Sequence, residues 1–239
     1  MKRALVTGGS GGIGAAICRK LAANGYDVLV HANGNLAKAE SVAEEIRAGG
    51  GSARAIAFDV TDAAAAKAVL EKELEAGVIQ VLVNNAGIHA DAIFPAMSQA
   101  KWASVIDVSL NGFYNVTQPL TMAMLRSRWG RIINITSVAG IVGNRGQVNY
   151  SAAKGAINAA TKSLALEVAT RGVTVNAVAP GVIDTGMIEG VFDAEAIKKI
   201  VPMQRAGKPD EVADLVAFLA SDAAAYISGQ VISINGAMV

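Results

Sequence analysis

Short apolar runs alternate along the chain with longer segments in which apolar residues recur every three or four positions. The short runs predict seven strands: Ala4–Val6, Val28–His31, Ala55–Phe58, Val81–Val83, Arg131–Ile135, Thr174–Ala177 and Val231–Ile234. The longer segments predict helices, among them Ala15–Asn24, Leu36–Ala48, Ala63–Glu75, Trp102–Leu125 and Tyr150–Thr170. Repeated strand–helix–strand units form parallel sheets with right-handed crossovers, so we expect an α/β fold with a doubly wound parallel sheet and helices on both faces.

The composition indicates a single domain that spans residues 1–239. Of these residues 52% are hydrophobic and 17% charged, and no linker divides the chain. The net charge of +1 does not favour binding to nucleic acid or to a membrane through bulk charge. The single cysteine, Cys18, excludes an intrachain disulfide, and its Ala-rich helical surroundings predict a buried, unreactive thiol. His31 and His89 have no partners at metal-site spacing, so we expect no metal.

The sequence also lacks the patterns of targeting and membrane segments. Met1-Lys2-Arg3 leads directly into the first predicted strand and leaves no room for the apolar stretch of a signal peptide. No apolar run is long enough to cross a bilayer. We therefore expect a cytoplasmic protein.

A glycine-rich loop links the first predicted strand to the first helix. It reads Thr7-Gly8-Gly9-Ser10-Gly11-Gly12-Ile13-Gly14. Its glycines permit a tight turn and a close approach of the backbone to phosphate, and the helix that follows offers free N–H groups. A flexible turn would have the same composition, but the place between strand and helix favours a Rossmann-type dinucleotide site, with residues 8–14 contacting the cofactor.

The end of the second predicted strand indicates which nucleotide binds. NAD sites usually carry an acidic residue there for the ribose 2′-hydroxyl, and His31-Ala32-Asn33-Gly34-Asn35 has none. A 2′-phosphate would not be repelled, so we expect NADP(H), with Asn33 among its contacts. Asp59 and Val60 follow the third strand and are candidates for the adenine edge, although Asp59 could instead cap the next helix.

Tyr150 and Lys154 stand four residues apart in a predicted helix and so share one of its faces. A free tyrosine titrates near ~10, and a positive charge beside it favours the phenolate and lowers that pKa. The pair therefore predicts a general acid, although the same spacing also occurs on solvated helix faces.

Polar residues directly follow two further predicted strands, at Asn84-Asn85-Ala86-Gly87 and at Ser137. Open α/β sheets place their ligands at the carboxyl ends of strands. Together with the glycine loop, Asn111, the Tyr150–Lys154 pair and Pro180-Gly181, these motifs resemble the short-chain dehydrogenase/reductase family. Residues 143–154 and 176–181 are most similar to its 3-oxoacyl-acyl-carrier-protein (β-ketoacyl) reductases.

The resemblance implies a role for each matching residue. Tyr150 protonates the carbonyl oxygen of the substrate as hydride reaches the carbon, and Ser137 orients that oxygen. Lys154 binds the nicotinamide ribose and depresses the Tyr150 pKa, and Asn111 helps to hold a water chain that resupplies the proton. Without the resemblance, Ser137 would be interpreted as a polar residue at a strand end and Asn111 as an amide on a helix surface.

The resemblance also implies cofactor contacts beyond the glycine loop. They are Asn85, Ala86, Gly87, Tyr150, Lys154, Pro180, Gly181, Ile183 and Thr185. Residues 186–205 follow, with apolar side chains such as Met187, Phe192 and Ile197 between two turns. We expect this segment to be a lid over the substrate, with plain core packing as the alternative.

The chain departs from the family pattern at the nucleotide site. Many NADP-dependent members carry arginine where this chain has Gly11 and Gly34, which leaves a 2′-phosphate to Ser10, Asn33 and backbone donors. Near the C-terminus, Ala237 replaces a glycine.

Arg128 and Arg171 match two exposed arginines that the acyl-carrier reductases use against their acidic carrier protein. Surface arginines at turns are common, so either one alone would indicate little. Together they favour a carrier-bound substrate over a coenzyme-A thioester.

The sequence as a whole predicts NADPH-dependent reduction of 3-oxoacyl thioesters on acyl carrier protein to 3-hydroxyacyl thioesters, in fatty acid synthesis. One alternative is a related enzyme that acts on acetoacetyl-CoA, a sugar or another alcohol or ketone. Another is a non-catalytic dinucleotide-binding regulator. Apolar residues occur on more than one face of the predicted helices 102–125 and 150–170, and the resemblance implies a homotetramer.

Overall fold

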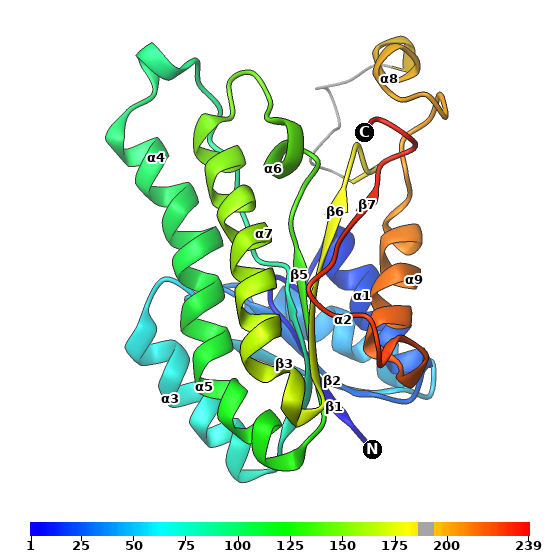
Figure 1. Ribbon diagram of the computed structural model, residues 1–239. Helices are drawn as coiled ribbons and strands as arrows, with labels where there is room; N and C mark the ends of the chain where they lie inside the picture. Colours follow the sequence, from blue (N-terminus) through cyan, green and yellow to red (C-terminus); the bar gives the residue numbers. More distant parts are fainter. Residues whose placement is uncertain (186–193) are drawn as a thin grey trace.

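Seven parallel strands form one sheet in the order β3-β2-β1-β4-β5-β6-β7, in a computed structural model that describes residues 1–185 and 194–239 (Figure 1). The strands are β1 (Arg3–Val6), β2 (Asp27–Ala32), β3 (Ser52–Ala57), β4 (Ile79–Asn84), β5 (Gly130–Ile135), β6 (Val173–Pro180) and β7 (Val231–Ile234). The α-helices are α1 (Gly12–Ala23), α2 (Leu36–Ala48), α3 (Ala63–Glu75), α4 (Gln99–Ile106), α5 (Gly112–Ser127), α6 (Ala139–Val142), α7 (Val148–Val168), α8 (Ala194–Ile200) and α9 (Pro209–Ala220). The strand order reverses between β1 and β4, which is where doubly wound sheets bind their ligands.

The helices cover both faces of the sheet and enclose two apolar cores. One core joins α1, α2 and α9 to one face, and the other joins α3, α5 and α7 to the opposite face (Figure 1). Successive residues of β1 serve the two cores in turn, since Val6 packs in the first and Leu5 in the second. Burial on both sides explains why the strands are nearly continuous apolar runs, and the predicted doubly wound α/β fold is confirmed.

The predicted helix over residues 102–125 proves to be three segments. Between α4 and α5 the chain forms a π-helical turn, Asp107–Asn111. Such a turn inserts an extra residue into the helical repeat, so side chains beyond it point in directions that a regular helix would not predict. This turn lies at the centre of the candidate site.

Two smaller predictions can be compared directly with the structure. Cys18 is fully buried in α1, as predicted, and burial raises the pKa of its thiol. Asp59 does not cap α3, because Asp62 accepts hydrogen bonds from the amides of Ala64 and Ala65 and is itself the cap. Among the described residues, no helix is both long and apolar enough to span a membrane.

Candidate active site

The glycine loop leaves β1 and turns into α1 at the carboxyl edge of the sheet. Gly8 and Gly12 have φ of 62° and 52°, in the left-handed region that favours glycine. A Cβ at Gly14 would collide with the carbonyl oxygen of Gly8, so the loop and the first helical turn pack in direct backbone contact. The residue types of the loop are therefore required by its own conformation.

Asn85 holds this loop from the end of the neighbouring strand β4. Its side-chain amide donates to the carbonyl oxygens of Thr7 and Gly8 at 2.9 and 3.1 Å. Its backbone amide and that of Ala86 both donate to the Thr7 hydroxyl at 3.0 Å. The predicted cofactor contacts Asn85 and Ala86 thus lie beside the loop, and the Asn85 side chain is occupied in shaping it.

His31 supports the loop from β2, a role that the sequence did not reveal. The amide of Gly8 donates to its Nδ1 at 3.1 Å, and its Nε2 lies 2.8 Å from the carbonyl oxygen of Phe58. The first bond requires an unprotonated Nδ1, so Nε2 carries the proton and donates to Phe58. Burial, opposed by the bond to Phe58, lowers the His31 pKa, which favours this neutral form.

Ser137, Tyr150 and Lys154 come together where β5 ends and α7 begins. The Lys154 side chain is almost fully buried, and its Nζ donates to the carbonyl oxygen of Ile135 at 2.9 Å. Its Nζ lies 5.6 Å from the centre of the Tyr150 ring. The Ser137 Oγ accepts from the amide of Ala139 at 3.1 Å, which fixes the hydroxyl at the start of α6.

Burial governs the ionisation of this group. It lowers the Lys154 pKa to about 8. It raises the Tyr150 pKa, hydrogen bonding with Ser137 opposes that rise, and Asp91 adds to it. The predicted depression of the Tyr150 pKa by Lys154 is therefore not seen, because the cost of burying the phenolate outweighs its favourable contacts.

The structure does not bring Asn111 to these residues. Its side chain is exposed and donates to the Asp107 carboxylate at 2.8 Å, one turn back on the same segment. Ser109 instead is buried and lies on the same side of Gly87 as Lys154. A Cβ placed on Gly87 would lie 3.7 Å from the Ser109 Oγ and 3.2 Å from the Lys154 Nζ. Within the π-helical turn, Ser109 thus lies inward, near Gly87, and the predicted Asn111 lies at the surface.

The nucleotide end of the site contains a lysine that the sequence analysis missed. Asn33 and Gly34 are exposed after β2, and a Cβ at Gly34 would meet no atom within 4 Å. The Nζ of Lys38, in the first turn of α2, would lie 3.0 Å from a Cβ placed on Gly11. Its ammonium therefore lies over the glycine loop, and no carboxylate within residues 1–185 or 194–239 forms an ion pair with it.

The other predicted adenine-side residues have local structural roles. The Asp59 carboxylate accepts from the amide and the hydroxyl of Thr61, both at 2.8 Å. Val60 is buried in the core under α5, and its carbonyl oxygen accepts from Asn115. Only Asp59 is exposed where a ligand could reach it.

The segment after β6 crosses toward the glycine loop. The carbonyl oxygen of Pro180 accepts from Val138, and the Gly181 amide donates to Ile234. Ile183 is buried and pairs with Gly207, whereas the Thr185 Cγ2 would lie 3.6 Å from a Cβ on Gly12. Of the predicted lid, Met187 and Phe192 lie outside the described residues, and Ile197 lies in α8.

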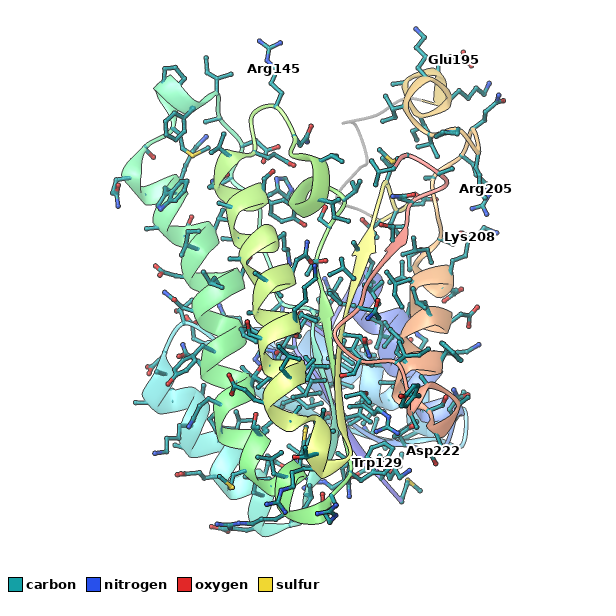
Figure 2. The ribbon with its side chains drawn as sticks, in the orientation of Figure 1. Trp129, Arg145, Glu195, Arg205, Lys208 and Asp222 are labelled. Carbon is teal, nitrogen blue, oxygen red and sulfur yellow. The ribbon has the colours of Figure 1, made fainter. Side chains whose placement is uncertain are left out.

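Arg128 and Arg171 are neighbours, but they lie at the opposite edge of the sheet. Arg128 ends α5 with φ of 54° and its side chain donates to the carbonyl oxygen of Thr170 at 3.5 Å. Both side chains are exposed, and the two residues precede the amino ends of β5 and β6. Trp129, the residue after Arg128, is labelled at this edge in Figure 2. Arg145, in the loop before Tyr150, is instead exposed at the carboxyl edge (Figure 2).

Comparison with known proteins finds relatives that match this chain over nearly its whole length. The family model for short chain dehydrogenases matches residues 2–196. The chain is 46% identical over 236 residues to a 3-oxoacyl-acyl-carrier-protein reductase of Aggregatibacter actinomycetemcomitans, covering 98% of each protein. It is 48% identical over 240 residues to such a reductase of Staphylococcus aureus and 44% identical to nodulation protein G of Azospirillum brasilense, each covering 99% of this chain and 98% of the relative.

These matches extend over nearly the whole chain, and the structure places the glycine loop, Tyr150 and Lys154 at one edge of a doubly wound sheet. The chain belongs to the short-chain dehydrogenase family.

Proposed function

We propose that this protein reduces 3-oxoacyl thioesters carried on acyl carrier protein to 3-hydroxyacyl thioesters, in fatty acid synthesis, with NADPH as the reductant. The observation that carries the proposal is the buried Lys154 beside Tyr150, next to the glycine loop. The substrate class rests on the names of the full-length relatives.

The residues at the carboxyl edge fit a dinucleotide. Gly12 is exposed in a left-handed conformation, and the first amides of α1 have no partner within the helix, which is the arrangement that binds a pyrophosphate. Bound NADPH supplies the hydride. The remaining contacts that we propose lie along Ser10–Gly14, Asn85–Gly87 and Pro180–Thr185.

Three side chains of this chain carry the proton chemistry in our proposal. Tyr150 donates its proton to the carbonyl oxygen of the substrate, where negative charge develops during reduction. Ser137 donates a second hydrogen bond to that oxygen and holds it near Tyr150. Lys154 donates one N–H to the carbonyl oxygen of Ile135, and its other N–H groups bind the ribose hydroxyls of the cofactor.

Lys38 supports the choice of NADPH over NADH. Its ammonium lies over Gly11 and so supplies a positive charge at the nucleotide end, where the chain has neither of the arginines that many NADP-dependent relatives use. The stretch after β2 adds no acid that would repel a 2′-phosphate. We therefore assign the 2′-phosphate to Lys38 together with Asn33 and Ser10.

A substrate panel tests the reaction. The purified protein is assayed with acetoacetyl groups on acyl carrier protein and on coenzyme A, each with NADPH and NADH. We expect the highest kcat/KM with the carrier substrate and NADPH. Equal or better turnover of unrelated ketones or sugars would contradict the substrate class, and no turnover of any ketone would favour a non-catalytic role.

The Lys38→Gln variant tests the cofactor assignment. We expect kcat/KM with NADPH to fall about tenfold and that with NADH to change less than twofold, since only NADPH carries the phosphate. Lys67→Gln is the matched control, because Lys67 is an exposed lysine in an ion pair with Glu71 on α3. An equal loss with both cofactors would contradict the role of Lys38.

Assembly and location complete the proposal. Tyr114 and Met122 on α5 and Leu166 on α7 are exposed apolar side chains, as expected if these helices pack against other subunits. We propose a homotetramer, which light scattering at several protein concentrations would test, and a cytoplasmic location, which cell fractionation would test.

A further inference from the structure

Two hydrogen bonds attach the glycine loop to His31, near the end of β2. The amide of Gly9 donates to the main-chain carbonyl oxygen of His31 at 2.8 Å, and the amide of Gly8 donates to the ring Nδ1 at 3.1 Å. The His31 residue is 1% exposed, and the centre of its ring lies 4.1 Å from the centre of the Phe58 ring. A backbone amide of the loop therefore depends on one buried, titratable side chain.

The two ring nitrogens have different partners, which fixes the protonation state of the ring. Nδ1 accepts from the Gly8 amide, whereas Nε2 donates to the carbonyl oxygen of Phe58 at 2.8 Å. In the imidazolium form both nitrogens carry a proton, so the Nδ1–H would face the N–H of Gly8. Protonation of His31 thus replaces the bond to Gly8 with a repulsive contact between two donors.

The loop has little room to move away from that contact. The carbonyl oxygen of Gly8 accepts from the Asn85 side-chain amide at 3.1 Å, and a Cβ on Gly14 would lie 2.2 Å from the same oxygen. A Cβ on Gly9 would lie 2.9 Å from the Cys18 Sγ. A shift of the loop therefore displaces the first turn of α1, whose free amides are the groups to which we assign the pyrophosphate.

One charged group among the described residues acts on the His31 ring. It is Asp59, which follows β3 and favours the imidazolium form, and the bond to Phe58 favours that form as well. Gly8 and Phe58, which contact the ring, are uncharged. Burial outweighs both effects, so the His31 pKa lies below the ordinary value of 6.5. The neutral ring predominates at neutral pH and is replaced by the imidazolium form in acid.

We propose that His31 positions the glycine loop for the dinucleotide, and that the cofactor binds only the form of the protein in which this ring is neutral. The inference rests on the proposed function only in that the glycine loop binds NADP(H). It makes His31 a positioning residue, which acts on the cofactor through Gly8 and the start of α1. The fraction of protein that can bind falls about tenfold for each pH unit below the His31 pKa, and the apparent Kd rises by the same factor.

An NMR spectrum of the imidazole nitrogens measures the state of the ring in the unmodified protein. The chemical shift of each nitrogen reports whether it carries a proton, and the chain has two histidines, His31 and the exposed His89. At neutral pH we expect His31 to carry its proton on Nε2 alone. A proton on Nδ1, or rapid exchange of the proton between both nitrogens, would overturn the inference. The same spectra, followed into acid, give the pH at which His31 gains its second proton.

Calorimetric titration with NADP⁺ and NAD⁺, from pH 8 down through that pH, measures cofactor binding without any substrate. We expect the Kd of both nucleotides to rise as His31 is protonated. NAD⁺ is the necessary comparison, because a phosphate monoester such as the 2′-phosphate of NADP⁺ has its own pKa near ~6. Only a change that both nucleotides share comes from the loop.

His31→Asn keeps an acceptor in the place of Nδ1 but does not titrate. We expect it to bind both nucleotides within about threefold of wild type at pH 8, and its binding of NAD⁺ should not weaken in acid. His89→Asn is the matched control and should weaken in acid as the wild type does. His31→Leu leaves the Gly8 amide without an acceptor and should bind both nucleotides about tenfold more weakly at every pH.

The outcomes separate this inference from the function on which it rests. If the Kd of NAD⁺ stays constant while His31 gains its proton, or if His31→Asn weakens in acid as the wild type does, the inference is wrong and the proposed function stands. If neither nucleotide binds at neutral pH, the proposed function is wrong as well.

Discussion

The two edges of the sheet treat buried charge in opposite ways. At the amino edge, Glu73 is paired with both Arg3 and Arg54. Arg131, which is 2% exposed, forms an ion pair with Asp222 at 3.3 Å, and its guanidinium carbon lies 4.2 Å from the centre of the Trp129 ring. Trp129 and Asp222 lie side by side at this edge (Figure 2). At the carboxyl edge, Lys154 is equally buried, yet its one bonded partner in the described chain is a neutral carbonyl group.

The pKa directions express this difference. Burial raises the Glu73 pKa, but the hydrogen bonds and charges of Arg54 and Arg3 outweigh it, and the net pKa is lowered. For Lys154 nothing offsets burial, and the pKa falls to about 8. Paired charges stabilise the fold, whereas a buried charge without a counter-ion destabilises it and is typical of a functional site. We infer that the amino edge serves stability and the carboxyl edge serves chemistry.

The largest effect is expected at Tyr150. Tyr150→Phe removes the proposed proton donor and keeps the ring, so kcat should fall at least about a hundredfold, with NADPH affinity nearly unchanged. Tyr26→Phe is the matched control, because its hydroxyl donates to Ala220 at 2.8 Å on the other side of the molecule. That variant should lose about 1 kcal/mol of stability and keep its activity. Activity within tenfold of wild type for Tyr150→Phe would exclude Tyr150 as the acid.

At the amino edge, Glu73→Gln should lower stability and leave activity unchanged, the reverse of what we expect for Tyr150→Phe. It leaves Arg3 and Arg54 without their carboxylate, and we expect the free energy of unfolding to fall by about 3 kcal/mol while kcat is unchanged. Because the Glu73 pKa is lowered in the folded state, this stabilisation is present at neutral pH and is lost as pH falls through that pKa. Urea unfolding at neutral and acidic pH measures both. If the difference in unfolding free energy between wild type and Glu73→Gln does not become smaller in acid, the charge of the Glu73 carboxylate is not the source of the stabilisation.

A smaller effect is expected from the exposed arginines of the amino edge, which test whether this edge also binds the carrier protein. Arg128→Glu with Arg171→Glu should lower kcat/KM about fivefold for a carrier-bound substrate at low salt, and less at high salt, because exposed charges are screened. A coenzyme-A thioester should be unaffected. β5 separates these arginines from the active edge, so a carrier docked there must deliver its acyl group across ~20 Å.

Arg145→Glu is the control at the carboxyl edge. If it alone impairs the carrier-bound substrate, the docking surface lies beside Tyr150 and the prediction for Arg128 and Arg171 is wrong.

The sequence revealed the sheet and the Tyr150–Lys154 pair because both depend on local spacing. It did not predict the π-helical turn, which shows no signal in the apolar pattern, and so gave no sign that Ser109 is buried there while Asn111 is exposed. The stretch Asp59-Val60-Thr61-Asp62 contains two aspartates that could cap the next helix. Asp62 is the N-cap because α3 begins at Ala63, and the sequence does not show where the helix begins. Lys38 reaches Gly11 through the packing of α2 beside the loop, a contact that no motif records.

Lys154→Met tests the contrast between the two edges most directly. The variant removes a buried charge that lacks a counter-ion and leaves a side chain of similar length. Between the ordinary lysine pKa of 10.5 and the folded value of about 8, the shift corresponds to about 3 kcal/mol against folding at neutral pH. Loss of the bond to Ile135 offsets part of the gain, so we expect the variant to be inactive and about 1–2 kcal/mol more stable than wild type.

The pH dependence of that difference is the decisive measurement. The lowered pKa means that the unfolded wild-type chain binds more protons than the folded one between pH 8 and 10.5, so wild-type stability rises across this range and the advantage of Lys154→Met shrinks. Chemical unfolding of both proteins from pH 7 to 10.5 measures this difference in the free energy of unfolding. A variant that is less stable than wild type at neutral pH, or an advantage that does not change with pH, would contradict the account.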